Sequence, residues 1–178
     1  IPRGPQKRGL ERRRKLIDTA FRLFESTPIE EVSYQDIASE AEIPLPSCYH
    51  FYPSKVDLIR AIAEDQTEAF NAEVFAPIDG DTLTSWERVI EVWLLRAIAF
   101  HQDNFARRQI FLGRHMPAEV RLDKQMRERT IAKNLQALIA SHFEIPASPG
   151  IDRAFFQAIE ISTLMVSLPM RSMIIWPT

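Results

Sequence analysis

The chain has 178 residues, of which 46% are hydrophobic and 26% are charged, and its formal net charge at pH 7 is −2. This composition is typical of a globular protein with one sizeable core or two small ones, and no apolar run is long enough to span a membrane. The five glycines form neither a G-x-x-x-x-G-K nor a G-x-G-x-x-G pattern, which excludes glycine-rich phosphate loops, and the single cysteine, Cys48, indicates a reducing, cytoplasmic compartment.

The first fifteen residues are strongly basic. Their one acidic residue is Glu11, and their basic residues are Arg3, Lys7, Arg8, Arg12, Arg13, Arg14 and Lys15. Because the whole chain is slightly acidic, the rest of it must carry an excess of negative charge. A basic arm on an acidic body predicts a polyanionic partner that is touched at one end, although a solvated tail would have the same composition. The chain begins with Ile1, so we expect the gene product to be longer.

The next part of the chain predicts three short helices and a connecting helix. Residues 10–26 repeat apolar side chains at helical spacing until Pro28. Ser33 stands three residues before an aspartate, which predicts the N-cap of a second helix. Two prolines then suit the first turn of a third helix at about 44–52, where amide protons have no helical partner. A fourth helix follows from a serine cap at residue 54 to about residue 75.

The second half of the chain is also predicted to be helical. Residues 85–101 are apolar on nearly every face, which predicts a helix buried on nearly all sides. A short helix should end near Gly113, a long one should run over 117–143 with a charged outer face, and another should fill 151–168. No strand-like alternation competes with these patterns. The predicted fold class is therefore all-α.

A capped short helix, a tight turn and a second short helix form a helix-turn-helix, whose second helix can lie in the major groove of DNA. The pattern resembles the DNA-binding segment of the tetracycline-repressor (TetR) family of bacterial transcription factors. The residues that match the family pattern, or replace it conservatively, are Ser33, Ile37, Ala38, Ala41, Ile43, Tyr49, Tyr52, Lys55 and Leu58. The resemblance covers about residues 10–60.

Four positions depart from the family pattern. Glu42 occupies the turn glycine, so the turn must be one that an L-residue can adopt, or it is strained. Pro44 replaces the capping serine, Pro46 fills a small-residue position, and Phe51 replaces a polar residue. We expect the two prolines to stiffen the start of the recognition helix and so to reduce the entropy lost on docking.

The resemblance implies a helix-turn-helix domain at 1–53 and a helical effector-binding and dimerisation domain at 54–178. It also implies one more long helix, which we expect to follow Thr178 in the complete protein. The implied function is a ligand-responsive repressor that binds a palindromic operator as a homodimer in the bacterial nucleoid. The alternatives are a helix-turn-helix regulator without an effector, and a ligand-binding or scaffold protein whose DNA-binding head has decayed. No nucleophile–base pair or metal-ligand spacing indicates an enzyme.

The predicted DNA contacts come from four segments. The second helix should anchor one DNA backbone, the recognition helix should read bases and phosphates, the fourth helix should bind a phosphate at its start, and the arm should enter a minor groove. In that order the residues are Ser33, Tyr34 and Gln35; Pro44, Leu45, Ser47, Tyr49 and His50; Lys55; and Arg3, Lys7 and Arg8. For each of them, solvent exposure or core packing is the alternative. The remaining recognition-helix residues, Cys48, Phe51 and Tyr52, should pack inward.

The predicted effector site lies in the second half and is marked by aromatic and charged residues. Its candidates are Trp93, Arg96, Phe100, Phe111, His115 and Glu160. Aromatic residues at helical spacing also fit a plain core, whereas a buried Arg96 needs a carboxylate partner, from Glu160 or from a ligand. No metal or other cofactor is expected. Small residues at 154, 158 and 162 predict close helix packing, either within the chain or across a dimer interface.

Overall fold

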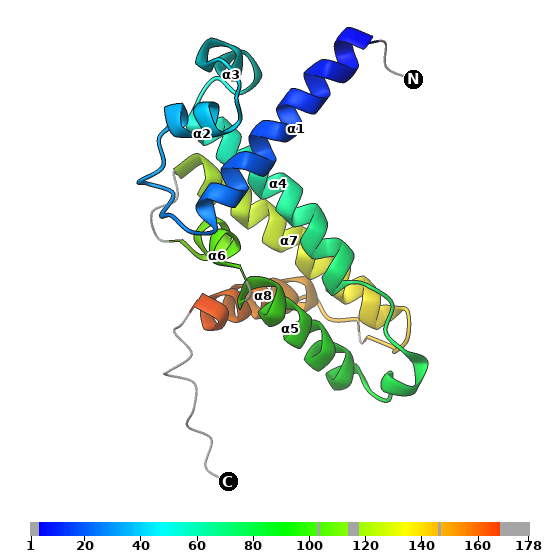
Figure 1. The fold of residues 1–178 in the computed structure, drawn as a ribbon. Helices are drawn as coiled ribbons and strands as arrows, with labels where there is room; N and C mark the ends of the chain where they lie inside the picture. The colour runs from blue at the N-terminus through cyan, green and yellow to red at the C-terminus, as the bar shows by residue number, and fades with distance from the viewer. Residues whose placement is uncertain (1–3, 103, 114–117, 146, 168–178) are drawn as a thin grey trace. The chain divides into compact units, whose positions relative to one another are not determined.

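The computed structural model describes residues 4–102, 104–113, 118–145 and 147–167, which form helices and connecting turns without a strand (Figure 1). The predicted all-α fold class is confirmed. The elements are α1 (Gly4–Phe24), α2 (Tyr34–Glu40), α3 (Leu45–Phe51), α4 (Lys55–Val74), a 3-10 turn (Gly80–Thr82), α5 (Trp86–Gln102), α6 (Phe105–Leu112), α7 (Ala118–Ala140) and α8 (Ile151–Ser167).

The chain divides into two compact units. The first comprises Ile1–Gln66 with Asn104–Val120, and the second comprises Thr67–Asp103 with Arg121–Thr178. The first unit thus contains α1, α2, α3, the start of α4 and, from much later in the sequence, α6. The predicted domain boundary after residue 53 stays a prediction.

The core of the first unit follows from helical spacing. On α1, Leu16, Ala20 and Phe24 recur every four residues, lie on one face and are fully buried. Other helices add apolar residues to the same cluster, namely Ile37 and Ala38 of α2, Cys48 of α3, Leu58 and Ile62 of α4, and Ala106 and Ile110 of α6. These contacts fix the short helices α2 and α3, which are too short to be stable alone.

Helix α1 begins earlier than the sequence predicts. The basic arm is helical from Gly4 onward, and Pro5 lies in the first turn, where a missing amide proton costs no hydrogen bond. Lys7 and Arg8 are exposed on this helix, so their charges lie on a helical element. Arg3 lies outside the described residues.

The N-terminus of α2 has the predicted serine cap. The Ser33 hydroxyl accepts from the amide of Asp36 at 3.0 Å, and the Ser33 amide donates to the Asp36 carboxylate at 2.8 Å. The hydroxyl also donates to that carboxylate at 2.6 Å. This reciprocal capping box satisfies two amide groups that the first turn would leave without partners.

The capping box should make stability depend on acid pH. The hydrogen bonds from Ser33 lower the pKa of Asp36 below its ordinary value of 3.8. Because the folded pKa lies below the unfolded one, this contribution is complete above pH 3.8 and is lost as the pH falls through the folded pKa. We expect the difference in urea-unfolding free energy between wild type and Asp36→Asn to shrink as the pH is lowered from 7 to 2.5. A difference that does not change with pH would contradict this account.

The second unit buries only one face of α5. Val89, Trp93, Ala97 and Phe100 are buried at spacings of three and four residues. Leu95, however, is 57% exposed and Trp86 is 50% exposed, so the prediction of burial on nearly all sides is wrong for this chain alone. Among the residues that the structure describes, no helix is both long and apolar enough to cross a membrane.

Candidate nucleic-acid interface

The turn between α2 and α3 is closed by a complete Schellman motif. The amide of Glu42 donates to the carbonyl of Ser39 at 3.0 Å, and the amide of Ile43 donates to the carbonyl of Ala38 at 3.0 Å. Glu42 itself has φ 54°, the left-handed conformation that this motif usually assigns to glycine. The expected turn is therefore present with an L-residue in the strained position, and it joins α2 to α3 without a longer loop.

Replacing Glu42 by glycine should stabilise the protein. Glycine adopts the left-handed conformation without the clash between Cβ and backbone, which we expect to raise the free energy of unfolding by about 0.5–1 kcal/mol. The variant loses an exposed ion pair with Lys15 at 3.3 Å, whose contribution is small. Urea unfolding of Glu42→Gly and Glu42→Ala separates the two effects, because alanine loses the ion pair and keeps the strain. An equal gain from alanine would rule out backbone strain as the cause.

Helix α3 has one buried and one outward face. Cys48 is fully buried, and Tyr52, the residue that ends the helix, is only 8% exposed. Phe51 packs against the same core, so the predicted inward residues are confirmed. On the other face, Tyr49 is 47% exposed and His50 is exposed.

The remaining recognition-helix candidates lie at the start of α3. Pro44 is the exposed N-cap residue, and it offers no side-chain hydrogen bond to the first turn. Leu45 is half-buried against the core, and Ser47 is half-buried. Side chains at these positions and at 49 and 50 present one aromatic ring, one imidazole and two hydroxyl groups. These groups suit phosphate and base-edge contacts, which stay predictions.

Tyr34 supports α3 from within the unit. Its side chain is 8% exposed, and its hydroxyl lies 2.8 Å from the carbonyl oxygen of Tyr52 and 3.1 Å from that of Cys48. Burial raises the pKa of this hydroxyl, so it keeps its proton and donates. The ring also meets the exposed Tyr49 ring edge to face, with centroids 5.0 Å apart. Tyr34 therefore orients α3, the predicted recognition helix. The sequence did not indicate this role.

Lys55 is also directed inward. Its ammonium group donates to the carbonyl oxygens of Ile29 and Val32 in the loop before α2. Burial lowers the pKa of Lys55. These bonds use two of the three ammonium protons of Lys55. The phosphate contact stays a prediction, and the third proton is the one available for it. Of the α2 candidates, Gln35 is exposed and Ser33 is engaged in the capping box.

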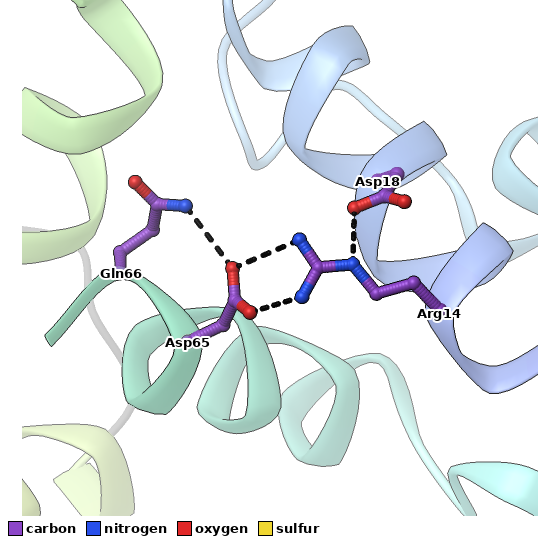
Figure 2. A network of polar contacts seen from close by, with 4 residues as sticks. All are labelled: Arg14, Asp18, Asp65 and Gln66. Atoms are coloured by element: carbon purple, nitrogen blue, oxygen red, sulfur yellow. Dashed lines mark hydrogen bonds and ion pairs between the residues drawn. The ribbon is translucent and has the colours of Figure 1, made fainter. Parts of the chain in front are cut away.

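A polar network ties α1 to α4 (Figure 2). The Arg14 guanidinium binds both carboxylate oxygens of Asp65, and its Nε lies 2.8 Å from Asp18 Oδ1. Gln66 donates to the Asp65 carboxylate at 3.2 Å and accepts from Arg107 Nε at 3.0 Å. Because Arg107 belongs to α6, the network connects three helices of the first unit.

Gln109 of α6 holds the loop between α1 and α2. Its amide nitrogen donates to the carbonyls of Phe24 at 2.8 Å and Thr27 at 3.2 Å, and its amide oxygen accepts from the amide of Ile29 at 2.8 Å. The same loop receives a bond from Asn104, whose amide donates to Glu25 at 2.7 Å. Sequence reasoning missed these residues, because partners about eighty positions apart leave no local pattern.

The predicted effector residues are not brought together as one charged site. Arg96 donates to the carbonyls of Ala76 at 2.5 Å and Pro77 at 3.2 Å, so backbone oxygens after the end of α4 replace the expected carboxylate. Glu160 is exposed on α8. Trp93 and Phe100 are 3% and 1% exposed in the second unit.

Two further candidates lie elsewhere. Phe111 packs against the core of the first unit, and His115 lies outside the described residues. In the described part of the chain, no group of three His, Cys, Asp or Glu side chains has the arrangement of a metal site.

Comparisons with known proteins identify both the motif and the fold. Residues 16–62 match the family model of bacterial regulatory proteins of the tetR family. The fold is similar to a tetR-family transcriptional regulator from Streptomyces coelicolor, with 22% identity over 93% of this chain and 73% of that chain and a TM-score of 0.69.

Two structures with bound small molecules are also similar. The multidrug binding protein EbrR complexed with imidazole has 20% identity over 95% of this chain and 89% of its own, with a TM-score of 0.68. RolR in complex with resorcinol has 17% identity over 91% of this chain and 80% of its own, with a TM-score of 0.65. At these identities the likeness establishes the fold. No curated protein matches this sequence.

Proposed function

We propose that this chain, whose residues 16–62 match the family model of bacterial regulatory proteins of the tetR family and whose fold is similar to that of a tetR-family transcriptional regulator, is a ligand-responsive repressor. In this proposal it binds a palindromic DNA operator as a homodimer, and a small molecule releases or modulates it. The observation that carries the proposal is the outward face of α3, where Tyr49 and His50 are exposed while Cys48 anchors the helix.

The arrangement around α3 supports DNA reading by a preorganised helix. Tyr34 supports its C-terminal end, Pro44 and Pro46 restrict its start, and the Schellman motif sets its angle to α2. The alternative of a decayed head rested on Glu42 and Pro44. It is disfavoured because the turn keeps both of its hydrogen bonds despite these residues. Lys7 and Arg8, exposed near the start of α1, supply positive charge for the DNA backbone.

A binding experiment tests this proposal. Selection from a random duplex library should yield a palindrome with half-sites about one helical turn apart. On that duplex, Tyr49→Phe and His50→Ala should each weaken binding by about tenfold in fluorescence anisotropy, because each removes a polar contact to DNA. His142→Ala, at an exposed histidine in the turn after α7, is the matched control and should bind like wild type. No enriched palindrome, or equal losses in all three variants, would refute the proposal.

The homodimer is supported by the outer face of α8. Ile161 is 58% exposed and Leu164 is 64% exposed, an unfavourable arrangement unless another surface covers them. Ala154 and Ala158 lie beside them and line an apolar groove of about 200 Å³ together with Trp93 and other residues of α5, α7 and α8. In the proposed dimer, apolar side chains of a second copy fill this groove. In this proposal the small residues at 154, 158 and 162 allow close helix packing between two chains, rather than within one chain.

Control by an effector is supported by two buried polar atoms of the second unit. Trp93 Nε1, a donor, and Asn71 Oδ1, an acceptor, have no hydrogen-bond partner in the described part of the chain. Buried polar atoms of this kind are costly unless a water or a ligand satisfies them. Since EbrR and RolR bind imidazole and resorcinol, we place a small effector that can both donate and accept hydrogen bonds near these atoms.

A further inference from the structure

A groove of about 460 Å³ lies between α7 and the first turns of α8 in the second unit. Its volume is within the range of small-molecule sites. The groove is lined by the basic residues Arg129, Lys133 and Arg153, by the apolar residues Met126 and Phe156, and by Asp152. It combines positive charge with an apolar wall.

The positive charge of this groove is only partly compensated. Arg129 and Lys133 are four residues apart on α7, so two like charges occupy neighbouring positions on one helix face. In the described residues, neither Lys133 nor Arg153 has an ion pair. Asp152 is the one acid among the described lining residues, and it stands in the first turn of α8, where a negative charge already stabilises the helix start. An anion in the groove would relieve the repulsion.

One of the three cations is already oriented. The Arg129 guanidinium lies over the Phe156 ring, 5.3 Å from its centroid. The N–H groups of a guanidinium that lies over a ring can form two parallel bonds to one anion. Met126 is 67% exposed beside it and offers an apolar contact. The groove thus suits a ligand with a charged head and an apolar body.

We propose that the groove between α7 and α8 binds a small organic phosphate monoester. A phosphate monoester carries close to two negative charges at pH 7 and presents three acceptor oxygens, which match the three cations that line this groove better than a single carboxylate does. Phe156 and Met126 contact the organic part. This site goes beyond the proposed repressor function and does not depend on it, because ligand binding there requires no DNA.

Calorimetric titration of the full chain with phenyl phosphate, without DNA, tests the proposal. We expect phenyl phosphate to bind at least about tenfold more tightly than inorganic phosphate or phenol, because it alone engages both the cations and the apolar wall. Lys133→Gln/Arg153→Gln should weaken this binding by about tenfold or more. Arg22→Gln/Arg88→Gln removes the same charge from exposed ion pairs elsewhere and should leave the affinity about unchanged.

Methionine-methyl NMR of the same samples locates the ligand. The Met126 methyl resonance, assigned with Met126→Leu, should shift on addition of phenyl phosphate in wild type and in the control double variant, but not in the groove variant. Equal affinities of the two double variants, an unmoved Met126 resonance, or inorganic phosphate binding as tightly as phenyl phosphate would each overturn the proposal. A Met126 shift caused by duplex DNA alone would assign the groove to nucleic acid and overturn it as well.

Discussion

Lys55→Met should lower the free energy of unfolding by about 2–3 kcal/mol. The side chain of Lys55 is the hydrogen-bond donor to the carbonyls of Ile29 and Val32, whose residues are 9% and 4% exposed. Methionine fills similar space but leaves both carbonyls without this donor in a place where water has limited access. Urea unfolding followed by circular dichroism measures the loss.

Lys133→Met provides the matched control, because Lys133 is exposed and forms no ion pair within the described residues. Its unfolding free energy should stay within about 0.5 kcal/mol of wild type. If the two methionine variants were equally stable, the inward bonds of Lys55 would contribute nothing. The prediction also bears on DNA studies, because a DNA-binding defect in a Lys55 variant would mix lost stability with lost contact.

The starts of α2 and α3 could be predicted because the residues that cause them are close in sequence. Ser33 caps α2 through a residue three positions away, and Pro44 marks the start of α3 because proline cannot continue a helix. The inward face of α3 followed from helical spacing, which places Cys48 on the core side. Capping residues, prolines and the helical spacing of apolar residues are therefore enough to predict the motif and the fold class.

The roles of individual polar side chains could not be predicted in the same way. Tyr34 and Lys55 have groups that suit DNA phosphates equally well, but the folded unit directs both toward backbone carbonyls 14 to 26 residues away in sequence. Arg96 was expected to need a carboxylate, yet carbonyls at the end of α4 satisfy it. A sequence pattern shows which groups can donate, whereas tertiary packing decides which acceptors they reach.

Gln109→Ala should also cost about 2–3 kcal/mol of unfolding free energy. The amide of Gln109 joins α6 to the loop that follows α1 through three bonds, to Phe24, Thr27 and Ile29. Alanine removes all three bonds and leaves the amide of Ile29 without this acceptor, in a residue that is 9% exposed. Gln157→Ala, an exposed position on α8, is the matched control and should change stability by less than about 0.5 kcal/mol.

Gln109→Glu sharpens the test, because it keeps the shape of the side chain and changes only its donor. Near neutral pH the carboxylate still accepts from Ile29, but it can no longer donate to the carbonyls of Phe24 and Thr27, which repel it. We therefore expect Gln109→Glu to be less stable than wild type at pH 7. The gap should narrow as the pH is lowered from 7 and should be smallest below about pH 4, where a protonated acid donates again. A gap that is the same at both pH values would show that the amide nitrogen is not what holds the loop.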